Sequence, residues 1–197
     1  MLIPCVNILI NSNEGIDYMS YFVFVDNSNV WIEGKIASAV AKGWAKNYIE
    51  AHRKKIEDCS WRIDFGKLLL CVTSGNIQSI KKAVLFGSKP PHNDSLWNAI
   101  ANAQFEVIAL NRNIAGKEKA VDTGIIARID KALYKEASAG DTFVLVMGDK
   151  DFIPALEAIR DEGCSSVIAF WNNASGELVS EADCFIDLTT KISQISH

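Results

Sequence analysis

The amino-acid sequence predicts an α/β protein: a single three-layer, Rossmann-like domain with a mainly parallel central sheet. Three observations lead to this class. Short apolar runs alternate with longer helical patterns, as in a parallel sheet that helices cover on both faces. The 197 residues suffice for one ordinary domain and are few for two. With 49% hydrophobic and 22% charged residues, the composition excludes general disorder.

The strand predictions rest on short apolar, aromatic and β-branched runs. The first of them, YFVFV, has no polar position, which is typical of a strand buried on both faces. Similar runs recur along the chain, and connections between parallel strands require helical crossovers. We expect strands at Tyr21–Val25, Lys82–Phe86, Phe105–Leu110, Thr142–Met147, Ser166–Phe170 and Cys184–Leu188.

Helical patterns lie between these strands. We expect helices at Lys35–Ile56, Ser95–Ala103, Val121–Ala137, Phe152–Glu162 and Glu177–Glu181. On the first of these, an apolar stripe faces the core and a basic stripe lies opposite. Two interpretations of the basic stripe stay open: an ordinary solvated face, which we favour, or a track for a phosphate backbone. The basic stripe consists of Lys35, Lys42, Lys46 and Arg53.

The domain is expected to span residues 20–190, because no repeat or Pro/Gly-rich linker divides the chain. Residues 1–19 are interpreted as a loosely attached leader, with Met19 as an alternative start, and residues 191–197 as a tail. The N-terminal run lacks the basic region of a signal peptide. The five scattered cysteines predict neither a zinc site nor a disulfide framework and favour a reducing, cytoplasmic location.

The charge balance limits the classes of partner. Twenty Lys and Arg face 24 Asp and Glu, for a net charge of −4, which argues against a bulk electrostatic grip on nucleic acid. A local basic stripe or a cation-binding site remains compatible with it. No apolar run approaches the ~18 residues of a membrane span. We therefore expect no membrane partner.

Carboxylates follow the predicted strands. Asp26 comes directly after the first strand, and Asp149 and Asp151 follow the fourth. Asp122 falls in the first turn of the predicted helix after Leu110. In open parallel sheets, ligands bind beyond the carboxyl ends of the strands, so these four acids are expected at one edge.

Each acid also has a purely structural interpretation. Asp151 could cap a helix, Asp122 could favour a helix dipole, and Asp26 with Asn29 could belong to a turn. Four carboxylates at one edge, however, raise one another's pKa unless a cation offsets their charge. Oxygen ligands without histidine or cysteine suit Mg²⁺ or Mn²⁺.

Such a site predicts phosphoryl chemistry. A divalent ion held by aspartates polarises a phosphoryl oxygen and lowers the pKa of a bound water, and no histidine is placed as a general base. Asn29 and Ser28 could hold a metal-bound water or a phosphate oxygen. Lys119 and Lys150 could contact the scissile phosphate, although lysines beside acids are often ordinary surface pairs.

Three segments resemble the signature blocks of the NYN domain family, in its LabA-like (DUF88) branch, whose members are relatives of PIN-domain nucleases. They are FVFVDNSNVW, KEKAVDTGI and VLVMGDKDFIPALEAIRDEGC, in family order, from Tyr21 to about Phe170. The third block is the most specific. Two departures from the family pattern, Ala120 and Met147, remove no carboxylate.

The resemblance implies a PIN-like fold and a metal-dependent ribonuclease. By motif match, Asp26, Asp122, Asp149 and Asp151 would be the catalytic metal ligands for Mg²⁺ or Mn²⁺, with Asn29 beside them. The expected substrate is RNA, with single strands favoured because they reach a shallow acidic groove. Arg62 and Asp64, in WRIDFGKLLL, match the family more loosely and are given no role.

Two alternatives stay open. The same fold could bind RNA, a nucleotide or a protein without turnover, and homodimer formation is undecided. Another phosphoryl-transfer enzyme is less favoured, because the first block lacks the D-x-D-x-T of haloacid-dehalogenase phosphatases, and a toprim site wants a glutamate where Asp26 stands.

Overall fold

The computed structural model describes residues 19–88, 105–110 and 118–197, with the backbone alone for residues 88, 109–110 and 118–122. The strands of the described part form one six-stranded, all-parallel sheet of order β3-β2-β1-β4-β5-β6. All six predicted strands are confirmed, with ends shifted by at most two residues. The strands are β1 (Tyr21–Asp26), β2 (Ile80–Ser88), β3 (Glu106–Leu110), β4 (Thr142–Val146), β5 (Ser165–Phe170) and β6 (Cys184–Asp187).

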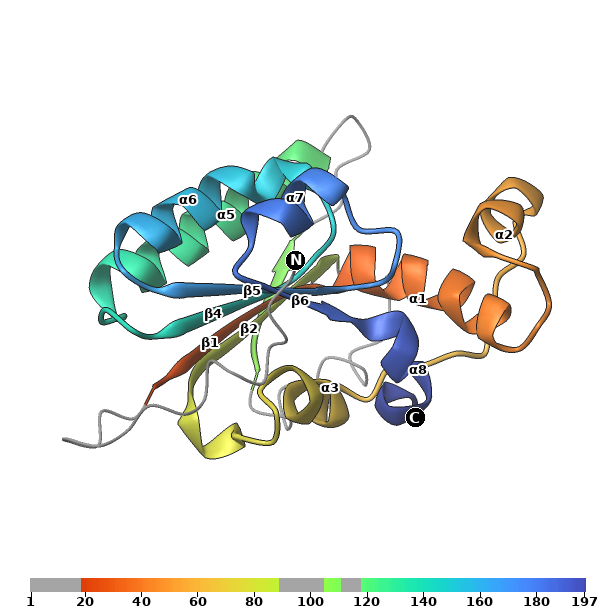
Figure 1. Ribbon diagram of the computed structural model, residues 1–197, viewed down its shortest axis with the longest axis horizontal. Coiled ribbons are helices and arrows are strands. Elements are labelled where there is room, and N and C mark those ends of the chain that lie inside the picture. The colour runs from red at the N-terminus through yellow and green to blue at the C-terminus, as the bar shows by residue number, and fades with distance from the viewer. Residues whose placement is uncertain (1–18, 89–104, 111–117) are drawn as a thin grey trace.

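Helices cover both faces of this sheet, which confirms the three-layer α/β class (Figure 1). On one face lie α5 (Glu118–Lys135), α6 (Ile153–Asp161) and α7 (Gly176–Glu181). On the other lie α1 (Asn27–Ala41), α3 (Phe65–Val72) and α8 (Ile192–Ile195). The remaining described helices are α2 (Tyr48–Lys54) and the short 3₁₀ turns η2 (Ile77–Ser79), η3 (Lys150–Phe152) and η4 (Leu188–Lys191).

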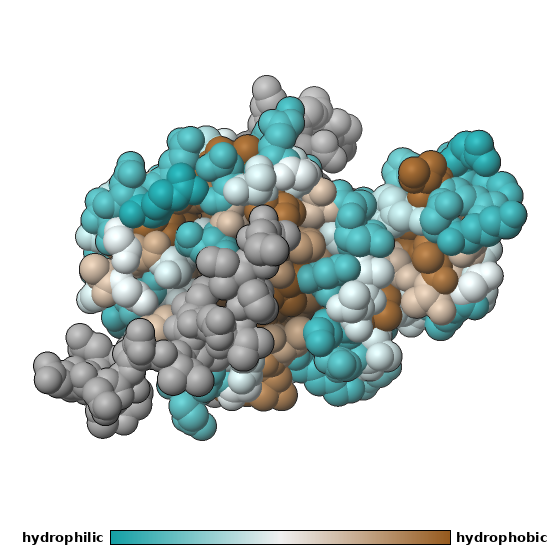
Figure 2. Space-filling view, viewed as in Figure 1, coloured by the Kyte–Doolittle hydropathy of each residue, from teal (hydrophilic) through white to brown (hydrophobic). Residues whose placement is uncertain are grey.

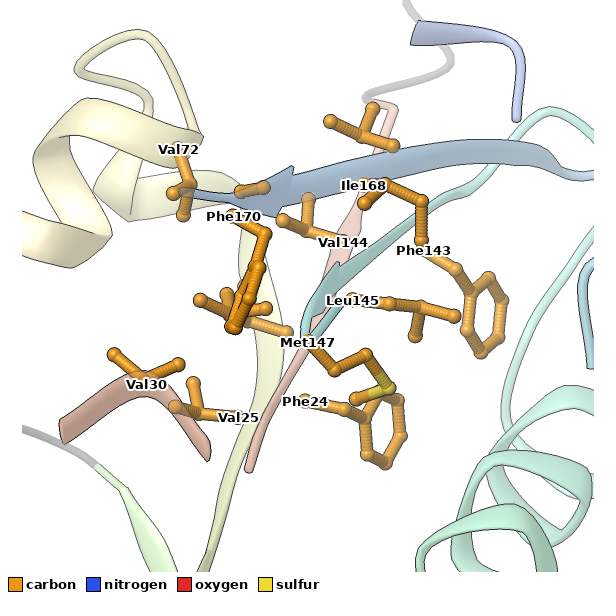
Figure 3. Packing of buried hydrophobic residues seen from close by; sticks show 14 of the residues in the cluster. Phe24, Val25, Val30, Val72, Phe143, Val144, Leu145, Met147, Ile168 and Phe170 are labelled. Carbon is orange, nitrogen blue, oxygen red and sulfur yellow. The ribbon is translucent and has the colours of Figure 1, made fainter. Parts of the chain in front are cut away.

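Alternation along the strands divides the core between the two faces of the sheet. Val25 of β1 and Phe170 of β5 lie beside Val30 of α1, whereas Phe24 and Phe143 lie on the opposite side (Figure 3). The rings of Phe24 and Phe143 stack with their centroids 6.1 Å apart. All five side chains are at most 2% exposed, as expected of strands covered twice.

The predicted helix Lys35–Ile56 is wrong in its extent. The first helix begins earlier, at Asn27, because Asp26 caps it, and it ends at Ala41. Gly43 then adopts a positive φ of 74°, which breaks the helical path, and Asn47 caps the separate helix α2. The apolar residues keep a period of 3.6 across the break, so the sequence pattern did not indicate where the first helix ends.

Three other predicted helices correspond to helices of the structure. Val121–Ala137 corresponds to α5, Glu177–Glu181 to α7, and Phe152–Glu162 to η3 followed by α6. The predicted helix Ser95–Ala103 and the proposed leader, apart from its last residue, lie outside the described residues. Helix α3, in the segment WRIDFGKLLL, was not predicted, and Asp64 caps it by accepting the Lys67 N–H.

The described C-terminal residues are packed against the domain. Residues 191–197 include α8, whose Ile195 is fully buried. The Trp61 indole donates a hydrogen bond to the Ser196 hydroxyl at 2.8 Å. Among the described helices, none is long and apolar enough to cross a membrane. Cys184 is disulfide-bonded, which the scattered cysteines did not predict.

Candidate functional site

The candidate site lies where the order of the strands reverses. Strands β1 and β4 are neighbours at the centre of the sheet, and the chain leaves them toward α1 and η3 respectively. This switch point is where open α/β sheets bind ligands. It brings together the first and third predicted motifs, which stand more than 100 residues apart in the sequence.

Asp26 is held rigidly at the end of β1. Its Oδ1 accepts the backbone N–H of Ser28 at 3.0 Å and that of Asn29 at 3.2 Å, so it caps α1, and the residue is 6% exposed. Asp26 therefore caps a helix instead of belonging to a turn, and this structural role does not exclude a chemical one. A carboxylate that accepts two backbone N–H groups is held in position.

Asn29 connects the two acidic motifs. Its backbone N–H contacts Asp26, and its side-chain amide donates to Asp149 Oδ2 at 2.9 Å. The structure thus places Asp26, Asn29 and Asp149 in one hydrogen-bonded group. Asp149 is exposed to solvent, where a ligand can reach it.

The position of Asp149 depends on the glycine before it. A Cβ on Gly148 would lie 2.3 Å from two ring atoms of Phe170, so only glycine fits against this ring. The Gly148 carbonyl also accepts the Ser175 N–H at 2.9 Å. The G-D step is therefore clamped between β5 and the loop before α7.

The start of α1 is fixed in a similar way. The Trp171 indole donates to the Val30 carbonyl at 3.0 Å, and a Cβ on Gly34 would clash with both Trp61 and Trp171. These two indoles meet edge to face, with centroids 5.6 Å apart. This packing sets the height of α1 and hence the position of Asn29.

Glu33 is a further carboxylate on the helix that carries Asn29, and the sequence did not single it out. One helical turn after Asn29, its carboxylate accepts the Asn173 amide at 3.0 Å. Burial raises the pKa of Glu33; the Asn173 hydrogen bond and the charge of His52 lower it, and the charges of Asp149 and Glu57 raise it further. The spacing of four from Asn29 was the one signal available in the sequence.

The other predicted site residues lie on α1, η3 and α5. Ser28 is half-buried in the first turn of α1, and Asp151 is exposed in η3. Lys150 Nζ lies 3.5 Å from Glu177 of α7, an exposed pair. Asp122 belongs to the second turn of α5, one turn deeper than predicted, and α5 packs against η3. The side chains of Asp122 and Lys119 lie outside the described part.

The donors fit a hard divalent cation in kind. They are carboxylate and amide oxygens, which Mg²⁺ and Mn²⁺ prefer. Within the side chains that the structure describes, no three acids, histidines or cysteines form a ready metal-binding group.

A family model decides the relationship: the NYN domain matches residues 22–189. This chain belongs to the NYN domain family. The match confirms the resemblance seen in the three motifs, and NYN domains are relatives of PIN-domain nucleases.

The chain also resembles a solved structure. A crystal structure of a protein of unknown function from Vibrio parahaemolyticus is similar, with a TM-score of 0.64 and 15% identity, over 93% of this chain and 100% of that one. At this identity the similarity shows the fold alone. Among curated proteins, no match is found.

Proposed function

We propose that this NYN domain is a Mg²⁺- or Mn²⁺-dependent ribonuclease that hydrolyses phosphodiester bonds of single-stranded RNA. The single observation that carries the proposal is the link from Asp26 through Asn29 to Asp149 at the switch point of the sheet. Membership of a PIN-like nuclease family supports the same chemistry.

In this proposal Asp26 and Asp149 hold the cation, with Asp122 and Asp151 completing the site. When bound, the metal supplies Lewis-acid chemistry: it polarises a phosphoryl oxygen and lowers the pKa of a coordinated water. Asn29 keeps the Asp149 carboxylate oriented, as outer partners of metal ligands do.

The basic and polar neighbours have supporting roles. Lys119 and Lys150 attract the scissile phosphate, and Ser28 and Asn29 offer hydrogen bonds to its oxygens. Lys150 would have to leave Glu177, which costs little because the pair is exposed and its atoms are 3.5 Å apart.

The test is cleavage of a labelled single-stranded RNA by purified protein with Mn²⁺. Asp149→Asn should lower kcat by about a hundredfold or more, because a metal ligand contributes several kcal/mol to the transition state. Asn29→Ala should lower it by about 10- to 100-fold. Asp161→Asn, an exposed acid at the far end of α6, is the matched control and should cleave normally.

Circular dichroism separates loss of chemistry from loss of fold. RNA left intact by the wild-type protein with Mn²⁺, or cleaved equally well by Asp149→Asn, would contradict the proposal. RNA binding without any cleavage would instead favour the alternative, a non-catalytic binding module of the same fold.

A further inference from the structure

Helix α2 forms a small lobe that stands out from the body of the protein. It projects beyond the C-terminal end of α1, away from the sheet (Figure 1). It packs on α1 through a separate set of apolar side chains, distinct from the main core. This set comprises the buried Ile36, Ala45 and Ala51 and the partly buried Val40, Tyr48 and Ile56. We call residues 42–55 the α2 arm.

The arm is basic although the whole chain is acidic. Residues 42–55 contain five Lys or Arg and one Glu, so their net charge is +4, whereas the chain carries −4. The remainder therefore carries −8. A concentration of one sign on a projecting element attracts a partner of the opposite sign.

Part of this charge is already paired: one pair attaches the arm to Asp58, and the other lies within α2. Lys42 pairs with the buried Asp58 at 2.6 Å, and Lys54 pairs with Glu50 at 2.7 Å. The other three cations, Lys46, Arg53 and Lys55, are exposed, and none forms an ion pair within the described part of the chain. Only half of the predicted basic stripe thus stays unpaired, because Lys35 is bound to Glu57.

Apolar side chains are exposed among these cations. Trp44 is 53% exposed, with Lys42 Nζ 5.2 Å from its ring centroid, and Ile49 is 77% exposed. Figure 2 shows hydrophobic patches that interrupt the hydrophilic surface of this lobe. An exposed indole on the same short segment as unpaired cations is a combination that binds single-stranded nucleic acid, since bases stack and phosphates pair.

The arm and the acidic site lie at opposite ends of α1: Asn29, which contacts Asp149, is in its first turn, and α2 packs near its C-terminal end (Figure 1). Helix α1 has 15 residues and is about 22 Å long, so a strand of several nucleotides can reach from one end to the other.

We propose that the α2 arm binds the RNA strand that leaves the acidic site, with Lys46, Arg53 and Lys55 contacting phosphates and Trp44 stacking on a base. This inference rests on the proposed function, whose site it extends into a path for a longer substrate. Affinity should therefore depend on substrate length, because RNA long enough to span α1 contacts the arm and a dinucleotide does not.

The experiment measures RNA binding where no cleavage occurs. In the Asp149→Asn background with EDTA, fluorescence anisotropy is titrated on a labelled 20-nucleotide oligo-U at several salt concentrations. K46E/R53E should weaken binding about tenfold or more and lower the salt slope by roughly 1.4, about 0.7 per lost phosphate contact. W44A should weaken binding several-fold with the slope unchanged.

The matched control is K131E/K135E, which makes the same charge change on exposed positions of α5. It should shift affinity less than twofold. K46Q/R53Q, with a smaller charge change, should fall between the wild-type arm and K46E/R53E, and circular dichroism checks the fold of each variant. In the otherwise wild-type protein, K46E/R53E should raise KM for the 20-mer and leave kinetics on a dinucleotide unchanged.

Three outcomes would overturn the proposal: equal loss in the α5 control, no loss in the arm variants, or an arm-dependent change in sedimentation that marks it as an interface between copies. Its failure is separable from that of the nuclease. Arm-dependent binding without Mn²⁺ cleavage would refute only the nuclease, and cleavage without arm dependence would refute only the arm.

Discussion

At the scale of single residues, buried charge is placed where it joins segments. Asp58 is fully buried and accepts hydrogen bonds from Ser38, Ser60 and Lys42, so it ties the chain after α2 back to α1. Burial acts to raise its pKa, but these hydrogen bonds outweigh burial and hold the pKa well below its usual value. The attachment of the α2 arm therefore depends on an ionised carboxylate.

This gives a pH prediction. A carboxyl whose pKa is depressed in the folded state contributes stability that is complete above its unfolded pKa, about 3.9, and is lost as pH falls toward the folded value. Asp58→Asn should lower the free energy of unfolding by about 1.5–3 kcal/mol at pH 7. Urea titrations from pH 7 to 3 should show the gap beginning to narrow once the pH falls below about 3.9. Parallel curves for the two proteins would contradict this role.

At the scale of elements, close packing at glycines positions the acidic motifs. The turn between β4 and η3 is pressed against Phe170, and α1 is pressed against two indoles. Neither Gly148 nor Gly34 has a positive φ. Each is needed because a neighbouring ring occupies the space that a Cβ would take. The position of Asp149, the first aspartate of G-D-x-D, is thus set by the contact of Gly148 with Phe170 of β5.

Gly148→Ala should therefore harm both stability and chemistry. The new methyl group must displace the turn or the Phe170 ring, which costs about 1–3 kcal/mol. Asp149 should shift, and the rate of RNA cleavage should drop with it. Gly124→Ala is the control: it lies in open space on α5, so alanine should stabilise the protein by up to about 1 kcal/mol.

The double variant Gly148→Ala/Phe170→Leu tests the cause. A smaller side chain at position 170 should return part of the lost activity, and a double-mutant cycle from thermal unfolding measures the coupling. Strictly additive losses would mean that the contact with Phe170 does not position Asp149.

At the scale of the whole molecule, the sheet brings separate acidic motifs to one edge, and a cation there should stabilise the fold. A ligand that binds only the native state adds about 2.7 kcal/mol at a concentration 100 times its Kd. For a chain of 197 residues this raises the Tm by about 5–10 °C. Calorimetry with Mn²⁺ should show the increase for the wild type and for Asp161→Asn.

The same increase should vanish in Asp26→Asn and in Asp149→Asn. Because this readout needs no RNA, it separates metal binding from catalysis. A Tm that rises equally in all four proteins would place the Mn²⁺ elsewhere and leave the two aspartates as structural caps.

Much of the architecture could be predicted because its signals are local. A run such as YFVFV identifies a doubly covered strand by itself, and an acid after such a run must lie at the carboxyl edge of a parallel sheet. The long helix was mispredicted because one glycine, Gly43, ended it where the apolar period did not change. Helix α3 was missed because it is only eight residues long, too short to show a clear helical period.

The sequence by itself determined the class of fold, the order of the motifs and which acids follow the strands, since these follow from composition and from position along a strand. Only the tertiary structure decided which groups meet. Asn29 contacts Asp149 across 120 positions, and Trp171 fixes α1 across 141. The same packing left the α2 arm projecting. Such contacts depend on how closely α1 and η3 pack on the sheet. The volumes of the neighbouring rings and backbone set these distances, and no local sequence pattern indicates them.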